Sequence, residues 1–174
     1  MNAFDELEMI VEGIDNASNM DRMNLWPEIF ACITAEESVS VVKFALWIIG
    51  TCAQNNPEAQ DSLINKHSII SRLLDLWKER NNGDEDSLTI HAKIMYCLTS
   101  ILSNNPAGLK NFAFLDGFSA IEGFQESSVA LRSKISFFLC TVLGNEIGIE
   151  SVKELIGDAC PKLLAILNEG PSEE

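Results

Sequence analysis

Basic residues are scarce in this sequence. Its 174 residues include 12 Lys and Arg against 26 Asp and Glu, which gives a formal net charge of −14. Non-specific binding to nucleic acid or to an anionic membrane requires a surplus of cations. We therefore expect neither nucleic acid nor a membrane among its partners.

Membrane spans, metal motifs and paired cysteines are missing too. No apolar run approaches the roughly 20 residues that cross a bilayer. The first 21 residues contain six acidic residues and no Lys or Arg, unlike a signal peptide. Two His and five Cys without a CxxC pair predict no zinc site. The odd cysteine count favours reduced thiols and a cytoplasmic protein, and we expect Cys52, Cys97 and Cys140 to be buried because they lie within apolar helical patterns.

Motifs of catalysis are also missing. The sequence has no Gly-rich phosphate loop, no HExxH and no GxSxG. A cysteine nucleophile would need a neighbouring His, and the apolar surroundings of the cysteines argue against one. We expect a binding protein without a cofactor, and not an enzyme.

What the sequence does contain is an internal repeat. Residues 44–55, 93–104 and 134–145 align with one another at spacings of 49 and 41, and the extra length falls in the polar stretch 80–86. Units of about 42 residues are typical of armadillo or HEAT solenoids, in which each unit is too thin to bury its own apolar face.

Each copy has the pattern of a helix with one buried stripe. Apolar residues recur at i, i+3, i+4 and i+7, the spacing of a single helix face. These positions are Ala45, Ile48, Ile49 and Cys52, then Ile94, Cys97, Leu98 and Ile101, then Ile135, Phe138, Leu139 and Val142.

A second face repeats as well. It has an aromatic residue, then a hydroxyl four residues later, then an Asn: Trp47, Thr51 and Asn55; Tyr96, Ser100 and Asn104; Phe137, Thr141 and Asn145. The aromatic rings could face a partner or pack between repeats, and Phe137 is balanced between the two. We prefer a helix-end role for the Asn residues, because Asn tolerates the left-handed conformation. Trp26 and Trp77 lie outside this pattern and are expected to serve packing.

Shorter helices are expected between the long ones. They span 61–76, 111–124 and 151–167, with breaks near His67-Ser68, Asp116-Gly117 and Gly157-Asp158. Short, medium and long helices in each unit favour armadillo over the two-helix HEAT unit. Upstream, residues 4–14 and 26–33 predict an irregular helical cap, with Asp15-Asn16 ending a helix.

The predicted fold is therefore all-α, an armadillo-like right-handed helical solenoid of about three repeats. We expect one domain over residues 1–168, with a cap at 1–38, repeats at approximately 39–86, 87–127 and 128–168, and a frayed acidic tail at 169–174.

Three stretches resemble a known family. They are residues 3–17, which include Ala-Phe-Asp-Glu-Leu-Glu-Met-Ile-Val-Glu and Ile-Asp-Asn-Ala; residues 49–57, Ile-Gly-Thr-Cys-Ala-Gln-Asn-Asn-Pro; and residues 114–118, Phe-Leu-Asp-Gly-Phe. Over roughly residues 3–145 the chain resembles the armadillo-type cytosolic nucleotide exchange factors of heat-shock protein 70 (Hsp70), the Hsp70-binding protein family. This resemblance implies a co-chaperone, expected to be monomeric, that grips the ATPase domain of Hsp70 with its concave face so that ADP leaves and ATP enters.

The charge distribution suggests where that face lies. Residues 88–143 have a net charge of +1, and Lys43, Lys93 and Lys134 stand near the starts of the three repeated helices. Cations there oppose the helix dipole, so three in register suggest a functional row. By resemblance, Lys93 and Lys134 match basic family positions, whereas Lys43 does not match so cleanly. The predicted partner-binding ridge comprises Trp47, Thr51, Gln54, Asn55, Lys93, Tyr96, Ser100, Arg132, Lys134 and Thr141.

Two alternatives are weighed against this prediction. An armadillo scaffold for an extended peptide needs a ladder of Trp and Asn, but Thr51, Ser100 and Thr141 occupy the Asn positions, and only the first aromatic residue is Trp. A luminal exchange factor of the endoplasmic reticulum is disfavoured by the lack of a signal sequence and by the odd number of cysteines.

Overall fold

The computed structural model describes residues 3–121 and 128–143, and every regular element within them is a helix. The expected all-α class is confirmed for these residues. The helices are α1 (Ala3–Val11), α2 (Ile14–Arg22), α3 (Trp26–Ala31), α4 (Val39–Ala53), α5 (Pro57–Asn65), α6 (Ile69–Glu79), α7 (Glu85–Leu102), α8 (Pro106–Phe114), α9 (Gly117–Ala120) and α10 (Val129–Leu143).

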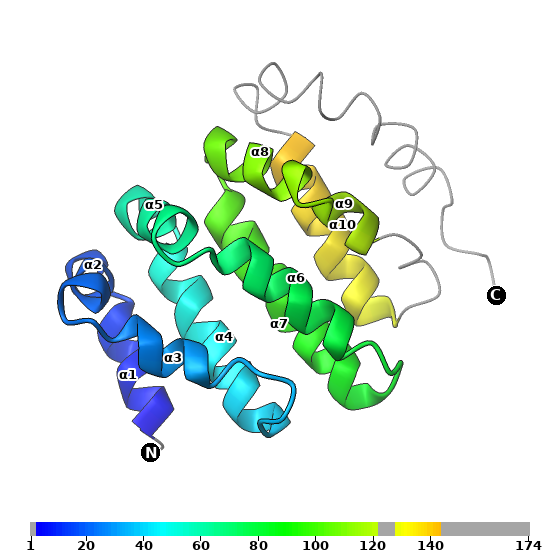
Figure 1. Ribbon diagram of the computed structural model, residues 1–174, viewed down its shortest axis with the longest axis horizontal. Helices are drawn as coiled ribbons and strands as arrows, with labels where there is room; N and C mark the ends of the chain where they lie inside the picture. The colour runs from blue at the N-terminus through cyan, green and yellow to red at the C-terminus, as the bar shows by residue number, and fades with distance from the viewer. Residues whose placement is uncertain (1–2, 122–127, 144–174) are drawn as a thin grey trace.

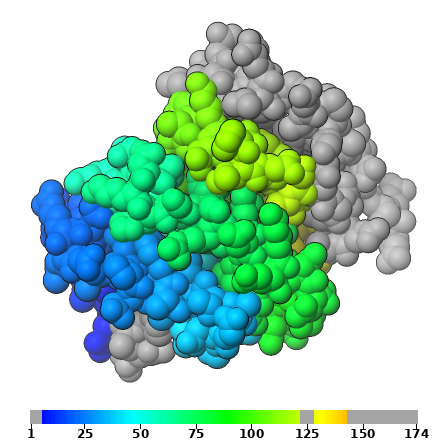
Figure 2. All heavy atoms as spheres, in the orientation of Figure 1, coloured from blue at the N-terminus to red at the C-terminus, as the bar shows by residue number. Residues whose placement is uncertain are grey.

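The helices form two layers. The long helices α4, α7 and α10 pack side by side in chain order, and α1 packs against α4 at one end of the row. The shorter helices α2–α3, α5–α6 and α8–α9 lie in front of this row in Figure 1. Figure 2 shows the face that they form, with the long helices largely behind it. One surface of the long helices therefore faces away from the short ones.

The core lies between the layers and between successive long helices. All twelve residues of the three predicted stripes are at most 3% exposed. The stripes are buried because removing apolar surface from water supplies most of the favourable free energy of packing. Trp26 and Trp77 are buried as well, which confirms their packing role.

Left-handed residues separate the short helices. Ser68 (φ 51°) lies between α5 and α6, and Asp116 (φ 57°) lies between α8 and α9, at the two predicted breaks. Asn24 (φ 51°) separates α2 from α3 in the same way. The third predicted break and the helix expected at 151–167 lie outside the described residues. With α1, α2 and α3, the predicted cap is more regular than expected.

One predicted helix end is wrong. Asp15 and Asn16 lie in the first turn of α2 instead of ending a helix. The side chain of Asn16 nevertheless donates from Nδ2 to the carbonyl oxygen of Ile10 at 2.9 Å, near the end of α1. Asn16 therefore contacts the end of α1 from a position inside α2.

The ends of α4 and α7 are built alike. Asn55 (φ 53°) and Asn104 (φ 54°) adopt the left-handed conformation, as predicted, while Asn145 lies outside the described residues. The next residue in each copy caps the following helix: Asn56 accepts from the amide of Ala59 at 3.2 Å, and Asn105 accepts from that of Gly108 at 2.9 Å. A Pro follows each cap, so α5 and α8 begin at Pro57 and Pro106, earlier than the expected residues 61 and 111.

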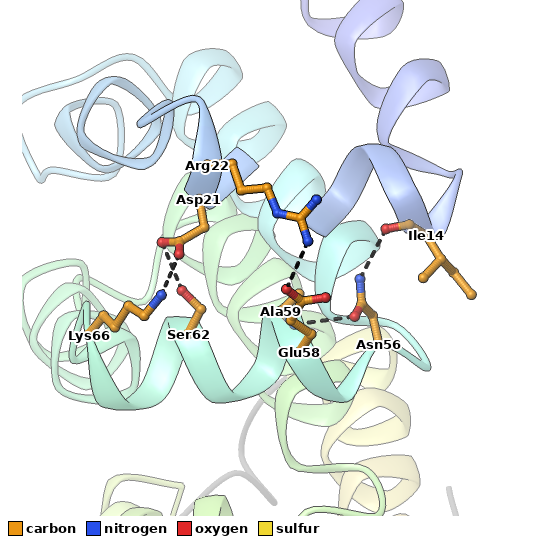
Figure 3. Close-up of polar contacts among 8 residues, drawn as sticks. All are labelled: Ile14, Asp21, Arg22, Asn56, Glu58, Ala59, Ser62 and Lys66. Carbon is orange, nitrogen blue, oxygen red and sulfur yellow. Dashed lines mark hydrogen bonds and ion pairs between the residues drawn. The ribbon is translucent and has the colours of Figure 1, made fainter. Parts of the chain in front are cut away.

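A polar junction joins the first two units (Figure 3). Asp21 of α2 accepts hydrogen bonds from Ser62 at 2.9 Å and from Lys66. It also contacts Nε2 of His67 at 3.1 Å. Hydrogen bonds from Lys66 and then His67 are the main causes that lower the Asp21 pKa to about 2. Arg22 and Glu58 lie beside them as an exposed ion pair at 3.7 Å.

The cysteines that the structure describes differ in exposure, and Cys32 is half-buried. Cys52 and Cys97 are buried, as expected, but Cys140 is exposed, so its predicted burial is wrong. Cys140 follows the exposed Phe137 by three residues and therefore shares its helix face, not that of the buried stripe. Within the described residues, no helix is long and apolar enough to span a membrane.

Candidate functional site

The predicted ridge lies along the three long helices. α4 contributes Trp47 and Thr51, with Gln54 and Asn55 just beyond its end. The remaining ridge residues come from α7, which contributes Lys93, Tyr96 and Ser100, and from α10, which contributes Arg132, Lys134 and Thr141.

Two hollows bring most of these residues together. A groove of about 600 Å³ is lined by Trp47, Lys93, Tyr96 and Lys134. A pocket of about 200 Å³ is lined by Gln54, Asn55, Tyr96, Ser100, Lys134 and Thr141. Together the two hollows are lined by eight of the ten predicted residues. Tyr96 and Lys134 line both hollows, so the two are adjacent. Of the other two predicted residues, Thr51 contacts Tyr96, whereas Arg132 lines neither hollow.

Lys93 lies between the aromatic rings of neighbouring helices. Its Nζ is 4.7 Å from the ring centroid of Trp47 and 5.8 Å from that of Tyr96, within the range of cation–π attraction. Burial lowers the pKa of Lys93, and the positive charges of Lys43 and Lys134 lower it further, against the opposing effects of Cys97 and Glu8. Lys43 and Lys134 are therefore each close enough to Lys93 to repel it.

Tyr96 is held against α4 by a glycine. A Cβ atom at Gly50 would lie 2.3 Å from Cε1 of Tyr96, so only glycine lets the ring approach this closely. The Tyr96 hydroxyl lies 3.3 Å from Oγ1 of Thr51, which also donates to Oε1 of Glu8 at 3.4 Å. Burial is the main cause of the raised pKa of Tyr96. One edge of the ring thus packs against α4, and Tyr96 also lines both hollows.

Phe137 is exposed instead of buried in the core. It is 64% exposed and lines the smaller pocket together with Met95. The hydroxyl of Thr141 donates to the carbonyl oxygen of Phe137 at 2.9 Å, one turn back along α10. Of the two roles considered for this residue, packing in the core does not apply.

The ridge also contains residues absent from the predicted set. The main ones are Glu8, Phe44, Glu85 and Met95, together with Phe137. Phe137 could have been found, because it shares the register of Trp47 and Tyr96. Glu8 could not, since it lies outside the repeat on another helix.

The thiols of α4 and α7 are buried. Burial raises the pKa of the Cys52 thiol to about 12 and that of Cys97 as well, so these thiols are poor nucleophiles. Among the described residues no group of His, Cys, Asp and Glu is arranged to hold a metal ion. What remains is an aromatic and cationic surface with hydroxyl and amide groups between the rings.

Comparison with known proteins adds independent information. No protein-family model matches this chain. It is 37% identical over 144 residues to the Hsp70 nucleotide exchange factor FES1 of Mycosarcoma maydis, an alignment that covers 82% of this chain and 35% of that protein. Identity is 34% over 149 residues with the fes1 protein of Schizosaccharomyces pombe, covering 83% of this chain and 48% of the relative. With the FES1 protein of Yarrowia lipolytica it is 29% over 155 residues, covering 87% and 53%.

All three relatives are named Hsp70 nucleotide exchange factors. The chain spans between about a third and a half of the length of each. Over the aligned part of its sequence, the chain is similar to Hsp70 nucleotide exchange factors.

Proposed function

We propose that this chain is a nucleotide exchange factor that binds the ATPase domain of Hsp70 and promotes the release of ADP. The observation that carries the proposal is the 37% identity to an Hsp70 nucleotide exchange factor across 82% of this chain.

The proposed mechanism is a linkage between two binding equilibria. The chain binds the open, ADP-free form of the ATPase domain more tightly than the closed, ADP-bound form. Thermodynamics then requires that ADP and the chain weaken each other's binding by the same factor. Because the binding energy of a protein interface drives the change, the chain needs neither its own nucleotide site nor a cofactor.

The proposal includes the fold and the binding face. A row of long helices covered by shorter ones in repeating order supports an armadillo-like right-handed solenoid, with repeats at approximately 39–86, 87–127 and 128–168. The ridge on the uncovered side of the long helices is the proposed contact with the ATPase domain. It offers the aromatic side chains Trp47, Tyr96 and Phe137, a residue type that is enriched at the centres of interfaces. We propose that the protein acts as a cytoplasmic monomer.

A nucleotide-release experiment tests the function. Purified Hsp70 is loaded with fluorescent ADP, chased with excess ATP, and the release rate is measured with and without the chain at micromolar concentrations. We expect acceleration that increases with the concentration of the chain. No acceleration would refute the proposal and favour a general scaffold that binds an extended peptide.

A charge-reversal variant tests the face. Lys93→Glu combined with Lys134→Glu should abolish acceleration without changing the helical content measured by circular dichroism. The matched control is Lys78→Glu with Lys110→Glu, which changes the net charge equally on exposed positions of α6 and α8. Equal activity of the two variants would show that the ridge is not the contact.

A further inference from the structure

Two lysines and three aromatic rings contact one another in succession along the ridge. Lys43 Nζ lies 5.4 Å from the ring centroid of Phe44, and Phe44 stacks on Trp47 with 6.1 Å between centroids. Lys93 then lies over Trp47 and reaches toward Tyr96. We call these five residues the cation–aromatic row. It crosses from α4 to α7, and Lys134 of α10 lines the same groove as its last three members.

The row concentrates positive charge on a strongly acidic protein. Lys43, Lys93 and Lys134 lie close enough for the outer two to lower the pKa of the middle one. Like charges at short range repel one another most where the dielectric constant is low, and Lys93 is half-buried. A carboxylate arriving from a partner would relieve this repulsion, whereas a cation would increase it.

Acidic residues border the row and limit what it can accept. Glu8 lies on the α1 side, where it accepts from Thr51, and Glu85 lines the groove at the start of α7. These carboxylates would repel an acidic segment that strayed from the lysines. The arrangement therefore favours a negatively charged segment and also limits where along the row that segment can bind.

The neighbouring pocket suits an apolar side chain. Its volume of about 200 Å³ is below the range of roughly 300–1,000 Å³ typical of small-molecule sites. Met95, Tyr96 and the exposed Phe137 supply apolar walls, and Lys134 connects it to the charged groove. A pocket of this size fits an anchoring residue of a protein better than a whole cofactor.

From these features we infer that the ridge recognises an acidic surface segment of the Hsp70 ATPase domain. Carboxylates of this segment meet Lys43, Lys93 and Lys134, and a neighbouring apolar side chain enters the pocket beside Phe137. The inference rests on the proposed function and adds the chemistry of the surface that is recognised. Complementary charges of this kind mainly accelerate association, and salt screens them.

Salt dependence tests the inference. Association and dissociation rates of the full chain with the Hsp70 ATPase domain are measured between roughly 0.05 and 0.3 M ionic strength. The screening length falls over this range, and the rate of electrostatically steered association falls more steeply. The test variant is Lys43→Ala with Lys134→Ala. Its control is Lys78→Ala with Lys110→Ala, which removes the same charge from exposed positions on α6 and α8.

The ridge variant should bind about tenfold more weakly at the lowest salt, mostly through slower association, and the deficit should shrink as salt rises. The control should stay within about twofold of the parent chain at every salt concentration. Phe137→Ser should weaken binding at all salt concentrations without altering the salt dependence, because it removes an apolar contact.

Each part of the inference can fail separately. Equal salt dependence in the ridge variant and the control would overturn the acidic-segment assignment, even if exchange of nucleotide is accelerated. Unchanged binding by Phe137→Ser would overturn the apolar anchor. Failure of the parent chain to bind the ATPase domain at any salt concentration would overturn the proposed function itself.

Discussion

Replacing Gly50 by Ala should destabilise the protein, although the same change stabilises most helices. Gly50 lies inside α4, where Ala is normally preferred to Gly by about 1 kcal/mol. Here the new Cβ would lie 2.3 Å from Cε1 and 2.6 Å from Cδ1 of Tyr96. Such a contact forces the ring or the helix to move, and overpacking of this kind costs about 1–3 kcal/mol.

The net change in unfolding free energy is the difference between these effects. We expect a loss of roughly 0–2 kcal/mol for Gly50→Ala in the parent chain. In a Tyr96→Ala background the clash disappears, so the same substitution should stabilise the protein by about 1 kcal/mol. The two substitutions should therefore be coupled by roughly 1–3 kcal/mol.

Urea unfolding of the four proteins, followed by circular dichroism at 222 nm, measures this coupling. The midpoints and slopes give the unfolding free energy of the parent chain, of each single variant and of the double variant. If Gly50→Ala stabilises the parent chain as much as it stabilises the Tyr96→Ala background, the two residues do not constrain each other, and the reasoning fails.

Two further predictions concern pH. Burial lowers the pKa of His91, which stacks on Trp77, so the unfolded chain binds a proton more readily than the folded chain. The stability of the protein should therefore fall as pH decreases through about 6.5. Thermal melts between pH 8 and pH 5 should show a smaller fall in melting temperature for His91→Phe than for the parent chain. The Asp21 pKa of about 2 means that its contribution is complete well above the ordinary value of 3.8 and is lost as pH falls toward 2. Allowing for solvent screening, Asp21→Asn should lower the unfolding free energy by about 1 kcal/mol at pH 7. Urea unfolding measured at a series of acidic pH values should show a weaker loss of stability in this variant than in the parent chain. An equal loss in the two proteins would contradict this role of Asp21.

Much of the fold could be predicted because its signals are local. The stripe containing Ile94 and Ile101 follows from the helical period, which depends only on neighbouring residues. The ends of α4 and α7 follow from the tolerance of Asn for the left-handed conformation, seen at Asn55 and Asn104. Asp15-Asn16 misled because an acidic side chain is also favoured in the first turn of a helix, where Asp15 lies.

The candidate site was predictable only in part. The register of the repeat identified Trp47, Lys93 and Tyr96, and the structure brings them into contact across two helices. Their relation to Glu8 depends on how α1 packs against α4, which no spacing within the repeat encodes.

The sequence alone determined that the chain repeats a helical unit, which side of each long helix is apolar, and that cations stand in register on a chain with a net charge of −14. These properties follow from the order of residues along a helix. Only the tertiary structure decided that Phe137 and Cys140 are exposed, and that the ring of Tyr96 fills the space left by Gly50. The physical reason is that exposure depends on which neighbouring helix covers a face, and packing against that neighbour is set by residues far away in the chain.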